Sequence, residues 1–212
     1  MINCIDMENW PRRKHFEHFR RMDYPHFNLC ANVDISPVHK FLKQNGLPFF
    51  KTILYITTRA ANCVKEFRYR IHGESVIEHD RVHPSFTVMM ENETFNFCTV
   101  LYSENAKIFF QKADEGIESA KRGINLDDEP GRDDLLFVTS IPWVSFTSLA
   151  HPIHMIPGDS IPRISWGKYM QDGGRILLPL SIQANHALVD GLHVGKYLSA
   201  LQELIDNPEI LF

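Results

Sequence analysis

The sequence predicts a single α/β domain over residues 1–212, built on a mixed β-sheet. Segments with helical periodicity alternate along the chain with short segments rich in β-branched and aromatic residues. The 212 residues are 44% hydrophobic and 23% charged, which suits one folded core. No repeat or Gly/Ser linker divides them, so we expect one domain.

The first half of the chain mixes helices and strands. A helix is expected over 11–22, because Pro11 suits a first helical turn and Phe16 and Phe19 fall on one side. The elements that follow have clear boundary signals: a β-rich strand over 26–35, a short helix over 36–46 between a serine cap and a glycine, an apolar helix over 49–67, and a hairpin over 69–79 around Gly73.

The second half is richer in strands. The acidic, turn-rich segment 123–134 is expected to be a surface loop within the domain. The remaining elements are expected in this order: strands over 85–90 and 94–102, a helix over 104–123, a strand over 135–149, two strands over 163–170 and 175–188 joined by a QDGG turn, and a helix over 190–205 with Val194, Leu198, Leu201 and Ile205 on one stripe.

Composition argues against several classes of protein. The net charge of −4 and the pI near 6.2 argue against a nucleic-acid binder. The first ten residues have neither a basic nor an apolar region, and no apolar stretch approaches membrane-spanning length, so neither a signal peptide nor membrane insertion is expected. Four dispersed cysteines, without a CxxC, indicate reduced thiols in a cytoplasmic protein: Cys4, Cys30, Cys63 and Cys98.

The segment PLSIQANHALVDGLHVGKYL, residues 179–198, is the most informative part of the chain. An apolar strand runs into His186, and Asp190 and Gly191 then precede a helix. A lone histidine is usually structural, and an aspartate before a helix is usually an N-cap. Their combination is more specific, because it leaves an imidazole at a strand exit, facing a cleft, and a carboxylate free to fix the turn by an ion pair.

This segment resembles the C-terminal signature of the chloramphenicol acetyltransferases of the trimeric type A family, and more broadly the HxxxDG acyltransferases. Other segments resemble the same family, so that the resemblance covers essentially the whole chain: NWPRRKHFEHFRR (9–21), EFRYRIHGESVIEHDRVHPSFTV (66–88), ETF (93–95), TSIPWVSFTS (139–148) and GKYMQDGGRILLPLSIQ (167–183). It implies a CoA-dependent acyltransferase fold, a two-layer mixed β-sheet sandwich with helices on one face. It also implies a homotrimer with active sites at subunit interfaces.

The resemblance implies direct transfer of the acetyl group of acetyl-CoA to the 3-hydroxyl of chloramphenicol, which confers antibiotic resistance. Acetyl-CoA would be a co-substrate, with no permanently bound cofactor and no metal. His186 would be the general base, and Thr139, where the family has a serine, would donate to the oxyanion of the tetrahedral intermediate. Asp190 would pair with Arg12 and hold the turn after His186.

Binding residues are implied in the same way. The acceptor pocket would be lined by Phe19, His18, Phe95, Leu126, Leu149 and His151, and CoA would contact Trp143, Lys168 and Tyr169. The chain departs from the family at several positions, which leaves the exact acceptor open: Asn185 for a histidine, His18, Leu126, Leu149 and His151 for other pocket residues, Arg163 for an aliphatic residue, and Pro48 for a lysine used toward CoA.

Three alternatives remain. The same fold could act on another small hydroxyl- or amine-bearing acceptor. The histidines of the sequence HPIH, at 151 and 154, together with His72, His79 and His83, could belong to a metal-binding domain, although HxxH is weak without a third ligand. The chain could be an acyltransferase core that uses lipoyl arms, although it carries no lipoyl segment. Of the eleven histidines, all but His18, His151 and His186 are expected to have no special role.

Overall fold

The computed structural model describes residues 2–123, 131–155 and 158–212. Segment 124–130, which holds most of the expected surface loop, lies outside the described residues. In chain order the elements are β1 (Ile2–Cys4), α1 (Arg13–Phe19), β2 (His26–Asp34), α2 (Ser36–Asn45), α3 (Phe49–Cys63), the 3-10 helix η1 (Lys65–Arg68), β3 (Tyr69–His72), β4 (Ser75–His79), β5 (His83–Met89), β6 (Phe95–Thr99), α4 (Ala106–Ala120), β7 (Leu135–Ile141), β8 (Arg163–Gly167), β9 (Met170–Asp172), β10 (Arg175–Asn185), α5 (Gly191–Asp206) and the 3-10 helix η2 (Pro208–Ile210).

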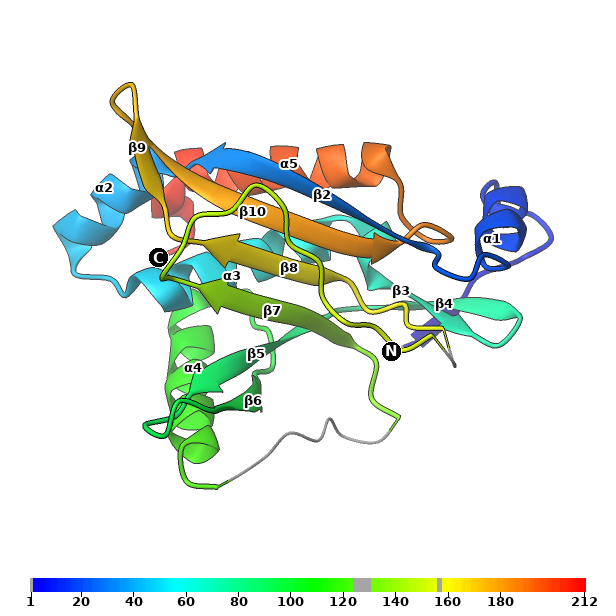
Figure 1. The fold of residues 1–212 in the computed structure, drawn as a ribbon, viewed down its shortest axis with the longest axis horizontal. Helices are drawn as coiled ribbons and strands as arrows, with labels where there is room; N and C mark the ends of the chain where they lie inside the picture. The colour runs from blue at the N-terminus through cyan, green and yellow to red at the C-terminus, as the bar shows by residue number, and fades with distance from the viewer. Residues whose placement is uncertain (1, 124–130, 156–157) are drawn as a thin grey trace.

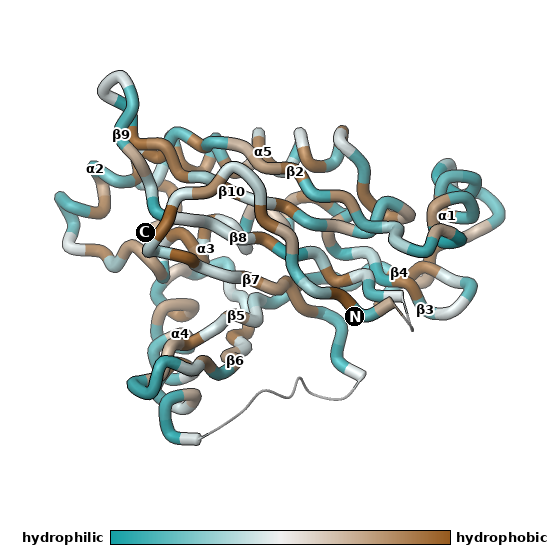
Figure 2. The backbone as a smooth tube through the Cα atoms, in the orientation of Figure 1, coloured by the Kyte–Doolittle hydropathy of each residue, from teal (hydrophilic) through white to brown (hydrophobic). Residues whose placement is uncertain are grey.

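The main sheet is mixed, as the sequence predicts. Its strand order is β2-β10-β8-β7-β5-β6, and β9 pairs with the start of β10. The β7 strand runs parallel to β8 and β5, whereas β10 is antiparallel to β2 and β8. Figure 1 shows α3 and α5 against one face of this sheet, and Figure 2 shows α1 as mainly hydrophilic. None of the helices in the described ranges combines the length and the hydropathy that crossing a bilayer requires.

The core lies between the main sheet and its helices. Helix α3 is buried on almost every side, and its buried threonines, Thr52, Thr57 and Thr58, donate their hydroxyls to backbone carbonyls of the preceding turn. Trp166 of β8 is fully buried, and the ring of Phe50 lies 5.9 Å from it and 5.4 Å from Phe86. Burying an aromatic side chain of this kind stabilises the fold by about 1.5–3 kcal/mol.

A second, three-stranded sheet has the order β1-β4-β3 and lies beside the main one (Figure 1). The expected hairpin around Gly73 forms β3 and β4, and Gly73 has φ +60° at the turn. The β1 strand pairs with β4 through three exposed residues, a length too short to leave a sequence pattern. The helix expected over 11–22 is shorter, since α1 spans Arg13–Phe19.

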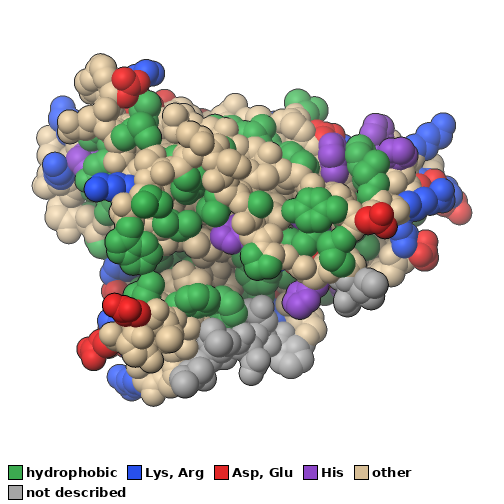
Figure 3. All heavy atoms as spheres, in the orientation of Figure 1, with side chains coloured by type: hydrophobic (Ala, Val, Ile, Leu, Met, Phe, Trp, Pro, Cys, Tyr) green, Lys and Arg blue, Asp and Glu red, His purple; other side chains and the backbone are tan. Residues whose placement is uncertain are grey.

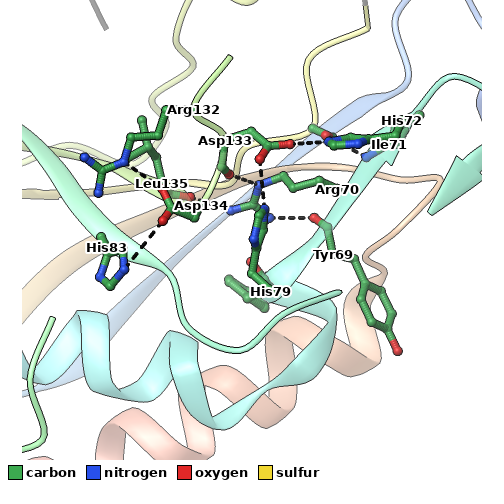
Figure 4. Close-up of polar contacts among 12 residues, drawn as sticks. Tyr69, Arg70, Ile71, His72, His79, His83, Arg132, Asp133, Asp134 and Leu135 are labelled. Atoms are coloured by element: carbon green, nitrogen blue, oxygen red, sulfur yellow. Dashed lines mark hydrogen bonds and ion pairs between the residues drawn. The ribbon is translucent and has the colours of Figure 1, made fainter. Parts of the chain in front are cut away.

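Arg70 ties this small sheet to the start of β7 (Figure 4). Its fully buried guanidinium donates to the carbonyls of Asp133 (2.6 Å), Tyr69 (2.5 Å), Phe67 (3.1 Å) and Leu135. Burial lowers the pKa of Arg70 to about 10, so the group stays charged at neutral pH. The Asp133 carboxylate in turn accepts hydrogen bonds from two imidazoles, His72 at 2.7 Å and His79 at 2.9 Å.

The strand expected over 135–149 is too long, because β7 ends at Ile141. Beyond it the chain leaves the sheet and approaches the end of β8, where the carbonyl of Val144 accepts from the amide of Lys168 at 2.8 Å. Gly167 permits this approach, since a Cβ at that position would lie 2.7 Å from the Val144 oxygen. The local sequence around β7 does not predict where this strand ends, because the close approach of Val144 depends on Gly167, a glycine 23 residues further along the chain.

Candidate active site

His186 lies one residue beyond the end of β10, at the point where the strand turns toward α5. Its amide donates to the carbonyl of Pro25 at 2.7 Å. The carbonyl of Asn185 accepts from the amides of Leu188 and Val189, both at 3.0 Å, and so closes the turn after the histidine. The antiparallel pairing of β10 with β2 extends to Asn185, so the strand exit is fixed directly before His186.

Aromatic rings hold the imidazole of His186. The ring of Phe19 stacks on it with centroids 4.0 Å apart and planes 6° apart. The ring of Phe27 lies 4.8 Å away at 45°. The Nδ1 atom of His186 is buried and has no hydrogen-bond partner among the described residues. Packing against these two rings therefore sets the plane of the half-buried imidazole.

Asp190 fixes the other end of the turn. Its carboxylate pairs with the guanidinium of Arg12 and accepts from the amide of Leu192 at 3.0 Å. Burial favours the neutral acid, but the hydrogen bond from Arg12 and the charges of His193 and Arg12 keep the pKa of Asp190 below its usual value. Removing one partner of a buried ion pair costs about 3–5 kcal/mol, and a partly exposed pair such as this one costs less.

A cavity of about 810 Å³ opens at a different part of the main sheet. Its lining is mostly apolar, with rings from α3, β6 and β7 and from the segment after β7. Four of the predicted site residues meet there: Phe95, Thr139, Trp143 and His151. A mostly apolar cavity with a few polar groups is typical of a small-molecule site.

His151 is anchored by its backbone and by its ring. Its amide donates to the side chain of Gln183 at 2.7 Å, and its carbonyl accepts from the same side chain at 3.2 Å. Its Nε2 lies 2.7 Å from the hydroxyl of Ser165. Burial and the charge of Arg163 lower the pKa of His151, so the imidazole is neutral at pH 7 and presents a hydrogen-bonding group to the cavity.

Arg163 forms a buried ion pair in the cavity wall. Its guanidinium pairs with Asp159, and their side chains are only 9% and 7% exposed. It also donates to the carbonyl of Ile161 at 3.0 Å and lies over the ring of Phe137 at 5.1 Å. An apolar side chain here would leave the wall uncharged, so the arginine makes the cavity more polar.

Within one chain, His186 and Thr139 lie far apart. Thr139 pairs with Ser165 on β8, and Ser165 pairs with Ser181 on β10, whereas His186 lies five residues beyond Ser181. Two strand spacings and five residues of strand correspond to a separation of about 20 Å. A single chain therefore cannot bring both side chains to one reacting atom.

Comparison with known proteins assigns the chain to a family. The family model for chloramphenicol acetyltransferase matches residues 1–202. The chain belongs to the chloramphenicol acetyltransferase family. It is 34% identical over 211 residues to the chloramphenicol acetyltransferase of Clostridium perfringens, covering 98% of this chain and 96% of the relative. It is 33% identical over 205 residues to chloramphenicol acetyltransferase 3 of Escherichia coli, covering 96% of both chains.

Solved structures agree with this assignment. A chloramphenicol acetyltransferase structure matches with a TM-score of 0.86 at 27% identity, covering 97% of this chain and all of the other. The dihydrolipoamide acetyltransferase of Azotobacter vinelandii matches with a TM-score of 0.68 at 16% identity, covering 92% of this chain and 86% of that one, which shows a shared fold. The chain is thus an acyltransferase with the CoA-dependent acyltransferase fold that the sequence predicts.

Among the described residues, the other predicted acceptor-pocket residues of this acetyltransferase do not line the cavity of their own chain. Phe19 stacks on His186, and the ring of the exposed His18 lies 5.1 Å from that of Phe19. The carbonyl of Leu149 accepts from the side chains of Asn28 and Ser181. Leu126 lies outside the described residues.

The residues predicted to contact CoA lie on exposed parts of the chain. Trp143 is 64% exposed and Tyr169 is 40% exposed. The Tyr169 ring lies 5.5 Å from that of Phe49 and 5.3 Å from that of His39, and the exposed Lys168 precedes it. Among the described residues no group of three or more His, Cys, Asp or Glu side chains could hold a metal ion.

Sequence reasoning missed a polar row on β10. Ser181, Gln183 and Asn185 alternate with three buried apolar residues, and each side chain bonds to the segment 149–159. Ser181 donates to Leu149, Gln183 donates to His151, and Asn185 donates to Asp159. This row holds the segment on the sheet. The period-2 alternation in LSIQAN is the signal that could have revealed it.

Proposed function

We propose that the enzyme transfers the acetyl group of acetyl-CoA to the 3-hydroxyl of chloramphenicol and so confers resistance. The observation that carries the proposal is His186, held between Phe19 and Phe27 at the exit of β10, with its turn fixed by the pair of Asp190 and Arg12. The relatives with full-length similarity bear the name chloramphenicol acetyltransferase, which supports this acceptor.

The proposed reaction is a direct transfer. The imidazole of His186 accepts the proton of the acceptor hydroxyl while the oxygen attacks the thioester carbonyl, and a base in this role contributes about 10²–10⁴-fold to the rate. The Thr139 hydroxyl donates to the oxyanion of the tetrahedral intermediate. Collapse of the intermediate breaks the C–S bond, and the departing thiolate takes the proton from His186.

We propose that His186 of one chain acts with Thr139 of another, in a homotrimer. The separation of about 20 Å within a chain supports this arrangement, because both groups must reach one reacting atom. Exposed apolar side chains also support it, since such patches mark interfaces. Figure 3 shows many of them on one face, and those with the largest exposure near the cavity include Met89, Phe95, Trp143 and Val144.

Binding roles follow from this arrangement. The acceptor would occupy the cavity beside Phe95 and His151, and the neighbouring chain would add Phe19 and His18. The exposed rings of Trp143 and Tyr169 offer faces for CoA, and Lys168 offers a charge for its phosphates. The cysteines are free, which suits the cytoplasm as the compartment.

The test measures thiol release. Purified enzyme is mixed with acetyl-CoA and chloramphenicol, and a thiol reagent reports free CoA. We expect release that depends on chloramphenicol, and a loss of about 10²-fold or more in His186→Ala. Absence of chloramphenicol-dependent release refutes the acceptor, and full activity of His186→Ala refutes the base.

A second candidate keeps the fold and changes the acceptor to another small alcohol or amine. The polar wall of the cavity favours it, because His151 and the pair of Arg163 and Asp159 could bind polar groups of a ligand. A panel of hydroxyl- and amine-bearing acceptors in the same assay separates the two, since the true acceptor gives the highest kcat/KM.

A further inference from the structure

His193 lies in the first turn of α5 and is 5% exposed. Its Nδ1 accepts a hydrogen bond from the backbone amide of Asp190 at 3.0 Å. Asp190 in turn caps the same helix with its carboxylate, so the two residues form a reciprocal capping box. The box closes the end of the 186–190 turn, opposite the end that Asn185 closes.

The hydrogen-bond acceptor at the third helical position of this capping box is unusual. A capping box ordinarily has Glu or Gln at the third helical position, and both remain acceptors at neutral and mildly acidic pH. An imidazole accepts at Nδ1 only while it is neutral, because the imidazolium carries a hydrogen on both nitrogens. Protonation of His193 would therefore turn an N–H toward the N–H of Asp190 and break the cap.

Charged groups face His193 from three elements. Nε2 lies 3.5 Å from a carboxylate oxygen of Glu66 on η1, and Nδ1 lies 3.2 Å from the carboxylate of Asp190. Arg12, directly before α1, and Lys196 of α5 are the nearby positive charges. Burial lowers the pKa of His193 first of all, and Arg12 and Lys196 lower it further against Glu66 and Asp190, so the ring is neutral at pH 7.

A protonated His193 would also compete with Arg12 for the Asp190 carboxylate. Its Nδ1 lies 3.2 Å from a carboxylate oxygen of Asp190, and that carboxylate already binds Arg12 and the amide of Leu192. We propose that His193 is a positioning residue for the catalytic base, whose neutral imidazole fixes the 186–190 turn and whose protonation releases that turn in mild acid. The inference rests on the proposed role of His186.

Two variants test the positioning role. His193→Gln keeps an acceptor at the third helical position and cannot be protonated, whereas His193→Leu has no acceptor. We expect His193→Gln to retain most of the wild-type kcat at pH 7.5. We expect His193→Leu to lose about 10–100-fold in kcat with little change in KM for acetyl-CoA, because misplacing a catalytic group costs this much. Equal kcat for the two variants would overturn the proposal.

The pH dependence tests the switch. The ratio of kcat/KM for wild type to that for His193→Gln removes the pH dependence that the two enzymes share, and we expect this ratio to fall below pH 6.5. His83→Gln is the matched control, because the Nδ1 of His83 accepts from the amide of Tyr102 at 2.9 Å but belongs to β5, away from the base. We expect the corresponding ratio for His83→Gln to stay constant, and a constant ratio for His193→Gln would overturn the switch.

Hydrogen–deuterium exchange measures the protection of the amides in this turn, independently of enzyme activity. After correction for intrinsic rates, we expect the amides of residues 187–190 to lose protection between pH 7 and pH 5.5 in wild type but not in His193→Gln. Unchanged protection in wild type would overturn the proposal even if acetyl transfer is confirmed. Loss of protection in a protein that transfers no acetyl group would support the cap while the proposed function of the enzyme fails.

Discussion

Two apolar rings, rather than a hydrogen bond to Nδ1 from the described residues, hold the imidazole of His186. Packing of this kind fixes the plane of the ring without a hydrogen bond to Nδ1 from the described residues. Thr139 differs, since it is half-buried in a cavity wall that a ligand can reach. The two candidate catalytic residues are thus positioned by different means, and they respond differently to substitution.

Thr139 offers a test of the oxyanion role. Thr139→Ser keeps the hydroxyl, whereas Thr139→Val keeps the shape and removes the donor. We expect Thr139→Ser to stay near wild type and Thr139→Val to lose about 10²–10³-fold in kcat, the usual cost of one oxyanion donor. Steady-state kinetics with saturating acetyl-CoA measures this, and wild-type kcat in Thr139→Val would exclude the role.

The elements that local signals define are predicted well from the sequence, and those that long-range contacts define are not. The order of elements, the QDGG turn between β9 and β10, and the final helix follow from local periodicity and from glycines such as Gly173 and Gly174, both at positive φ. The end of β7 and the strand β1 do not, because long-range contacts with Gly167 and β4 decide them. For the same reason local spacing finds His186 and Asp190 but not Gln183, whose partner His151 is 32 residues away.

The link between the small sheet and β7 predicts a pH effect on stability. Burial alone would raise the pKa of Asp133, but the hydrogen bonds from His79 and His72 lower it from 3.8 to about 2. Because the folded pKa is below the unfolded one, the carboxylate stabilises the fold above pH 4, and this contribution is lost as the pH falls from 4 toward 2.

We expect Asp133→Asn to be less stable than wild type by about 1–2 kcal/mol at pH 7, since the site is partly exposed. Urea unfolding measures the difference, which should shrink as the pH falls from 4 toward 2, because the carboxylate is protonated first in the unfolded chain and then in the folded protein. A difference that stays constant over this range would show that the carboxylate charge contributes nothing.

At the level of the whole molecule, the two halves of the site lie about 20 Å apart in one chain, so the proposed assembly must supply both. The cavity wall and the base then belong to different copies at every site. In a cyclic trimer each interface uses His186 of one chain and Thr139 of the next. A chain that lacks the His186 imidazole and a chain that lacks the Thr139 hydroxyl can therefore complement each other in a mixed trimer.

Mixing predicts complementation. His186→Ala and Thr139→Val are each expected to be nearly inactive as homotrimers. When they are unfolded together and refolded at equal amounts, every mixed trimer contains one interface with both intact residues. Three quarters of random trimers are mixed, so we expect about a quarter of wild-type activity to return. No gain over the separate variants would show that one chain supplies both residues.

The separation of the base from the cavity also affects how the enzyme can evolve. Substitutions that reshape the cavity fall on β5 to β8 and on the segment that carries His151, whereas the proposed base, His186, directly follows β10. A gene under selection by a new antibiotic can therefore alter its acceptor cavity step by step while the proton-transfer machinery stays unchanged. Arg163, paired with Asp159, is a cavity residue of this kind, on a strand that does not carry His186.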